Sequence, residues 1–130
     1  SEMCIRDSKL TKLSDVKAVY GNIDDHKIRI GLKSELFFKC EGVNIYMTHI
    51  GGYPGKYSKG VKEKIEKTNP NIFICGHSHI LKIMNDKKNK LLFLNPGAAG
   101  NHGVHKVKTI IKFDIDDKKI RNLKIIELKR

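Results

Sequence analysis

Cysteine, long apolar runs and repeats are scarce in this chain of 130 residues, and each scarcity argues against a class of protein. The three cysteines, Cys4, Cys40 and Cys75, lie far apart and form no Cys-x-x-Cys pair. Neither a disulfide framework nor a thiolate zinc cluster is indicated, so we expect reduced thiols. Cys75 stands close to His77 and could be a metal ligand, but its apolar neighbours favour a buried structural cysteine.

No stretch of the sequence has the roughly 18 apolar residues that a membrane-spanning helix needs. The sequence also does not open with the charged, apolar and small-residue segments of a secretory signal. We therefore expect a soluble, cytoplasmic protein without a membrane partner. The length allows one domain, or part of one, with a modest core. No internal repeat or low-complexity tract is present.

Positive charge, in contrast, is abundant: 26 Lys and Arg against 14 Asp and Glu give a formal net charge of +12. Such a charge favours anionic partners, including nucleic acid and phosphorylated substrates. The lysines are spread through almost every segment and form no stripe interleaved with aromatic side chains. We therefore expect a solvated surface that attracts phosphates, with a nucleic-acid-binding domain as the weaker alternative. The sequence does not indicate an oligomeric state.

The pattern of apolar residues predicts an α/β chain that is rich in strands. Residues 1–15 are interpreted as a leader and a helix remnant, and residues 16–130 as one domain. A helix is expected from Ser58 to about Lys67, ended by Asn69-Pro70. The glycine-rich stretch 50–55 is expected to be an irregular loop. Strands are expected at 17–20, 27–30, 36–40, 43–47, 72–75, 80–84, 90–94, 109–115 and 120–128.

Several of these strands end in nitrogen or oxygen donors. Asn22 and His49 each follow a short apolar run. His77 and His79 stand in a Gly-His-Ser-His sequence directly after the most apolar run, residues 71–75. Imidazoles at positions i and i+2 lie on the same side of an extended chain and can reach a shared point. The sequence therefore predicts a metal site formed by Asn22, His49, His77 and His79.

The donor types restrict the metal. Neutral imidazoles and an amide oxygen suit Mn²⁺, Fe²⁺, Ni²⁺ or Zn²⁺. A set without thiolates argues against a closed structural zinc site, so coordination positions would be open to water and phosphate. Further candidates stand on nearby loops, and among them His26 is expected at the surface. These outer candidates are Asp24, Asp25, His26, His102 and His105.

Each singled-out residue also has an ordinary structural explanation. His77 and His79 could be hydrogen-bonded strand-end histidines, and Asn22 could be a turn residue that bonds its own backbone. The matching contexts of these residues favour ligands. His102 and His105 follow the Asn-Pro-Gly loop, where we expect an exposed segment, with contact to substrate phosphate as the alternative.

Four motifs in this order resemble those of the calcineurin-like metallophosphoesterases: Gly-Asn-x-Asp from Gly21, Thr-His from Thr48, Gly-His-Ser-His from Gly76 and Asn-Pro-Gly from Asn95. The chain is most similar to small single-domain bacterial and archaeal phosphodiesterases, from about Val16 onward. The resemblance implies a β-sandwich flanked by helices. It also implies hydrolysis of a phosphate ester, expected to be a small-molecule diester, by metal-activated water. Two divalent cations would be needed, with Mn²⁺ expected and Fe, Ni or Zn as alternatives.

Carried over by position, the resemblance gives each donor a role. Asn22, His49 and His77 would bind the second cation, and His79 would bind the first. Asn22 and His49 would also contribute to catalysis. Asp24 would orient a ligand from outside the coordination shell.

Two motifs of the family are missing from this chain. One is an opening strand with Asp-x-His, and the other is a Gly-Asp motif whose aspartate bridges both cations. We therefore expect the chain to be the C-terminal part of the domain, without its first βαβ portion and with impaired activity. Ile23 stands where many members have a histidine that protonates the leaving group, so another acid would be required. The alternative is a non-catalytic scaffold that keeps the phosphoesterase fold.

Overall fold

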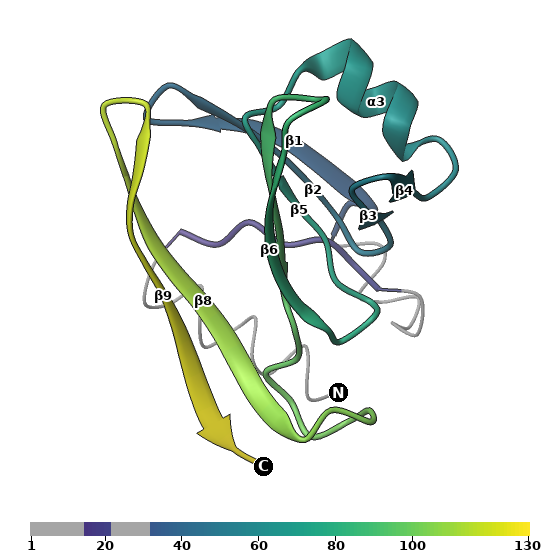
Figure 1. Ribbon diagram of the computed structural model, residues 1–130, viewed down its shortest axis with the longest axis vertical. Helices are drawn as coiled ribbons and strands as arrows, with labels where there is room; N and C mark the ends of the chain where they lie inside the picture. The colour runs from purple at the N-terminus through teal and green to yellow at the C-terminus, as the bar shows by residue number, and fades with distance from the viewer. Residues whose placement is uncertain (1–14, 22–31) are drawn as a thin grey trace.

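The computed structural model describes residues 15–21 and 32–130 (Figure 1). Apart from Asp15, the expected leader and helix remnant lie outside the described residues. The strand at 27–30 and the candidates also lie outside them: Asn22, Asp24, Asp25 and His26. The described elements are, in chain order, β1 (Glu35–Cys40), β2 (Val43–Thr48), β3 (Gly52–Tyr53), β4 (Lys56–Tyr57), α3 (Val61–Thr68), β5 (Ile72–Ile74), β6 (Leu81–Asp86), β7 (Leu91–Pro96), β8 (Val107–Asp116) and β9 (Lys119–Lys129).

Five of the strands form one mixed sheet in the order β1-β2-β5-β7-β6. The central strands β2, β5 and β7 run parallel, and β1 and β6 pair antiparallel at the two edges. A parallel strand in the middle of a sheet is covered on both faces and is therefore apolar throughout. β5 fits this rule because Ile72 and Phe73 have no exposed surface.

Alternate side chains of the central strands enter two separate cores. Helix α3 covers one face of the sheet, and the long β8–β9 hairpin covers the other (Figure 1). The core under the helix includes Tyr46, Val61, Ile65, Phe73 and Phe93. The core under the hairpin includes Val43, Ile45, Ile72 and Leu94, with Ile111 and Phe113 packed against them. The predicted α/β class is thus confirmed, as three layers with the sheet in the middle.

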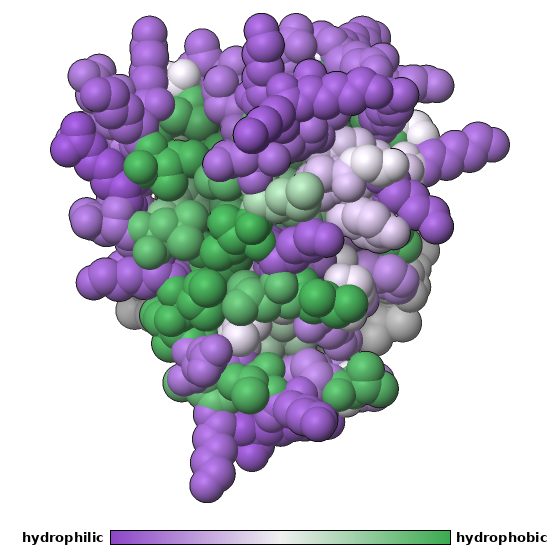
Figure 2. Space-filling model, in the orientation of Figure 1, coloured by the Kyte–Doolittle hydropathy of each residue, from purple (hydrophilic) through white to green (hydrophobic). Residues whose placement is uncertain are grey.

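The predicted C-terminal hairpin is also confirmed. Its turn residues Asp117 and Lys118 both have positive φ, 47° and 64°, which is the conformation of a type I′ turn that matches the twist of paired strands. The outward side chains Ile110 and Ile126 face each other across the hairpin, and each is 39% exposed. Figure 2 shows apolar side chains gathered over the region of β6 and this hairpin, with hydrophilic side chains around them.

Helix α3 begins three residues later than predicted, because Ser58 is used elsewhere. The backbone N–H of Ser58 donates to the carbonyl of Gly51, and its carbonyl accepts from Val61 N–H. Gly60, in the left-handed conformation, is the N-cap instead, and no side chain caps the helix there. The C-terminal prediction is right, since left-handed Asn69 ends the helix and donates to Ile65 O at 2.9 Å.

Two further local predictions are wrong. The stretch 50–55 is not wholly irregular, because Gly52–Tyr53 pairs with Lys56–Tyr57 as a short antiparallel hairpin. The run 17–20 forms only an isolated parallel bridge, between Val19 and Lys33. Within the described part of the chain, no helix is long and apolar enough to cross a membrane.

Candidate metal site

The carboxyl ends of β2, β5 and β7 lie at the same end of the sheet, because these strands are parallel neighbours. His49 follows β2, the segment 76–79 follows β5, and Asn95 lies near the end of β7. A backbone hydrogen bond of 2.9 Å from Gly76 N–H to His49 O ties the first two strand ends together. The topology therefore brings three of the four sequence motifs to the same end of the sheet.

His49 and His77 form a close pair at this end of the sheet. Nε2 of His49 lies 3.3 Å from Nδ1 of His77, and the ring planes meet at 78°. Two nitrogens bound to one cation at about 2.1 Å are separated by roughly 3.0 to 3.4 Å at angles between octahedral and tetrahedral. The spacing thus fits joint ligation of one ion and is at the long end for a hydrogen bond.

The backbone that presents His77 is unusual. Ser78 N–H donates to Gly76 O at 2.8 Å, and His77 between them has a φ of 67°. This is the pattern of a classic γ-turn, which is rare and strained. His79 also has a positive φ, 61°. Each such conformation costs about 1 to 3 kcal/mol and is typical of functional sites.

The side chain of Asn95 fixes this turn by hydrogen bonds. Its side chain is almost completely buried, with 3% exposed, and its amide donates to Gly76 O at 3.2 Å and to Ser78 Oγ at 3.0 Å. Its side-chain oxygen accepts from Gly97 N–H at 3.0 Å. The Asn-Pro-Gly motif stands out in the sequence, but this positioning role of Asn95 was not predicted from it. A polar residue directly after the apolar run Leu91 to Leu94 was the available signal.

The structure divides the predicted histidines between two pairs. His79 contacts His105 rather than the first pair, with ring centroids 5.4 Å apart and planes at 84°. Within residues 15–21 and 32–130, no three His, Cys, Asp or Glu side chains lie close enough to hold one ion. Asn22, the fourth predicted ligand, is outside these residues, so convergence of all four remains a prediction. His102 is exposed, as expected.

Cys75 is a structural cysteine, as the sequence favoured. Its side chain is 2% exposed, and its thiol donates to Gly52 O at 3.6 Å. Burial raises the pKa of this thiol to about 12. Because a thiol must lose its proton to bind a metal, Cys75 is a poor ligand at neutral pH.

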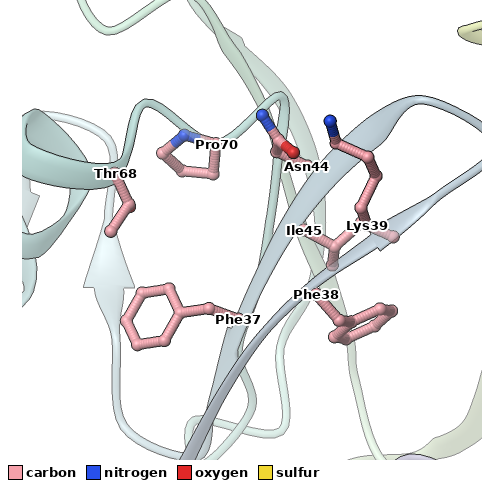
Figure 3. A pocket seen from close by; sticks show the side chains of 7 residues that line it. All are labelled: Phe37, Phe38, Lys39, Asn44, Ile45, Thr68 and Pro70. Atoms are coloured by element: carbon pink, nitrogen blue, oxygen red, sulfur yellow. The ribbon is translucent and has the colours of Figure 1, made fainter.

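A hollow of about 310 Å³ lies at the opposite end of the sheet (Figure 3). Its walls include Phe37, Asn44, Thr68 and Pro70. Asn44 is near the start of β2, and Pro70 precedes β5, whereas the histidines follow the ends of these strands. The hollow is therefore separate from the candidate metal site.

An α/β fold with histidines at the carboxyl ends of parallel strands defines the class of this protein. Residues 5–118 match the calcineurin-like phosphoesterase superfamily domain, and the chain belongs to this family. The resemblance found in the sequence is thereby confirmed. The family is metal-dependent.

Solved structures of this fold come from several organisms. Vps29 of Entamoeba histolytica, crystallised with Zn²⁺, is 20% identical over 89% of this chain and 69% of its own, with a TM-score of 0.64. An archaeal phosphodiesterase is 19% identical over 88% and 70%, with a TM-score of 0.67. A conserved Streptococcus pneumoniae protein, described as a predicted phosphoesterase, is 23% identical over 85% and 60%, with a TM-score of 0.63. At these identities the likeness establishes the fold, which is the predicted one. No curated protein matches the chain in sequence.

Proposed function

We propose that this protein is a metal-dependent phosphoesterase that hydrolyses phosphodiesters in the cytoplasm. The observation that carries the proposal is the spacing of 3.3 Å between Nε2 of His49 and Nδ1 of His77, which suits a shared cation. Membership of the calcineurin-like family supports it. The fold shared with an archaeal phosphodiesterase is compatible with it.

Each residue of the proposed site has a separate role. His49 and His77 would hold a cation through neutral ring nitrogens, with Asn22 as a further proposed ligand. Asn95 fixes the backbone of the turn. A cation held there would supply Lewis acidity, which would lower the pKa of water and offset charge on the phosphoryl oxygens. Mn²⁺ is the expected ion, with Fe, Ni and Zn as alternatives. The net charge of +12 attracts phosphate esters of small molecules to the surface.

The extent of the domain belongs to the same proposal. We assign residues 16–130 to the domain and expect a βαβ portion with Asp-x-His and Gly-Asp to precede them in the complete enzyme. Translation of the same reading frame upstream tests this, and it decides which chain to assay.

The activity test uses a chromogenic phosphodiester, with the matching monoester as a comparison. We expect Mn²⁺-dependent release of the chromophore from the diester. The rate should fall by more than about 100-fold in His77→Ala, which is more than residues that only orient a metal ligand usually contribute. His102→Gln is the control, because His102 is an exposed histidine of the segment between β7 and β8. Equal rates for His77→Ala and the parent protein would remove the assigned role.

The second candidate function is a non-catalytic scaffold. Apolar side chains on the β8–β9 hairpin favour it, since Ile125 and Leu128 are 44% and 45% exposed, and Figure 2 shows an apolar face there. The fold is also shared with Vps29. The scaffold predicts cation binding without turnover of either ester, whereas the enzyme predicts turnover that depends on His77.

A further inference from the structure

A second histidine pair lies next to the first, on the loop segments that follow β5 and β7. His79 comes from the turn after β5, and His105 comes from the segment between β7 and β8. Their rings meet edge to face with centroids 5.4 Å apart. We propose that His79 and His105 bind a divalent cation between them, so that His105 is a ligand that the sequence motifs do not assign. This inference rests on the proposed function and adds a ligand to its site.

The hydrogen bonding of His105 identifies the nitrogen that would bind. Nε2 of His105 lies 2.8 Å from Gly100 O, and a carbonyl oxygen only accepts, so Nε2 carries the proton. In the neutral ring, Nδ1 then has a free lone pair. This Nδ1 is buried and has no hydrogen-bond partner among the described residues. Metal-binding histidines commonly have this arrangement, with one ring N–H donated to a backbone carbonyl and the other nitrogen on the metal.

Gly103 is the residue that lies next to the Nδ1 atoms of both rings. Gly103 has a φ of 123° and lies against both histidines. A Cβ added there would collide with Nδ1 of His79 and would lie 3.0 Å from Nδ1 of His105. Both nitrogens therefore lie beside the same point next to Gly103, where a side chain at position 103 does not fit.

The loop that carries His105 is anchored to the end of β9. The guanidinium of Arg130 donates to the carbonyls of His105 and, at 2.6 Å, of Asn101. These contacts fix the backbone on both sides of Gly103 and reduce the ordering that cation binding would require. Two neutral imidazoles suit Zn²⁺, Co²⁺ or Ni²⁺, with water or a phosphate oxygen in the remaining positions.

Titration with Zn²⁺ alone, followed by ¹⁵N NMR of the histidine rings, tests the proposal. Before metal is added, long-range couplings should show Nε2 of His105 protonated and Nδ1 unprotonated. On titration, the Nδ1 resonance of His105 should shift together with ring resonances of His79. A protonated Nδ1 at neutral pH, or a His105 resonance that does not move at saturation, would overturn the proposal.

Calorimetry on variants gives a second readout. His105→Gln should weaken binding at this pair by more than about tenfold and leave binding at His49–His77 unchanged. His102→Gln, an exposed histidine of the same loop, should bind as the parent does. Gly103→Ala should also weaken binding at this pair, because its methyl group would collide with Nδ1 of His79 and the φ of 123° is strained for alanine. Unchanged affinity in both His105→Gln and Gly103→Ala would contradict the inference. Loss of diester hydrolysis in His77→Ala tests the proposed function and does not depend on these results.

Discussion

Asn95→Ala should loosen the turn that presents the histidines. The substitution removes two donated hydrogen bonds, to Gly76 O and Ser78 Oγ, and the bond that Asn95 accepts from Gly97 N–H. A buried hydrogen bond contributes about 1 kcal/mol, and a partner left unsatisfied costs about 1 to 3 kcal/mol. We therefore expect the free energy of unfolding to fall by about 3 kcal/mol.

The same change should weaken cation binding. The turn around His77 has a strained backbone, with a φ of 67°, and the amide of Asn95 is one of the groups that hold it. Residues that orient metal ligands typically contribute 10- to 100-fold in affinity, so we expect a loss of about that size. Urea unfolding followed by circular dichroism gives the stability, and calorimetry with Zn²⁺ gives the affinity.

Asn71→Ala is the matched control. The side chain of Asn71 accepts one hydrogen bond, from Asn44 N–H at 2.8 Å, at the opposite end of β5 from the histidines. Its loss should cost about 1 kcal/mol and leave Zn²⁺ affinity unchanged. If Asn95→Ala costs no more than Asn71→Ala, or binds Zn²⁺ as tightly as the parent, the positioning role is wrong.

Two further predictions concern buried titratable groups. Cys75 should resist a thiol reagent at pH 8 while exposed Cys40 reacts, because burial raises the pKa of Cys75 to about 12. Peptide mapping measures the labelling of each cysteine, and equal labelling would contradict this prediction. Burial alone would raise the pKa of Asp86, but hydrogen bonds from Asn89 and Tyr57 outweigh it and hold that pKa below its ordinary value. The carboxylate therefore stabilises the fold above about pH 4, and this contribution is lost as the pH falls through the lower folded pKa. In urea unfolding measured from pH 5 to pH 2, the free energy of unfolding should fall less steeply for Asp86→Asn than for the parent protein.

The layered core could be predicted from the sequence because its signals are strong. The run Ile72 to Cys75 is apolar throughout, which is typical of a strand covered on both faces. The C-terminal hairpin shows clear alternation around Asp116-Asp117. The start of α3 could not be predicted, since Ser58 is an ordinary capping residue whose backbone is engaged by Gly51 and Val61 in the folded protein.

The candidate site was predictable in part for the same reason. His49 and His77 follow apolar runs that become parallel neighbours, so their meeting at one edge follows from strand pairing. The pairing of His79 with His105 could not be predicted, because it depends on the path of a long loop. That path is set by the positive φ of Gly103 and by the Arg130 contacts, which no local pattern reveals.

The central claim is that His49 and His77 bind one cation. Anomalous diffraction at the zinc edge, from crystals grown with Zn²⁺, tests it most directly. We predict a peak about 2.0 to 2.1 Å from both Nε2 of His49 and Nδ1 of His77. A saturated crystal with no peak between these two nitrogens would contradict the account.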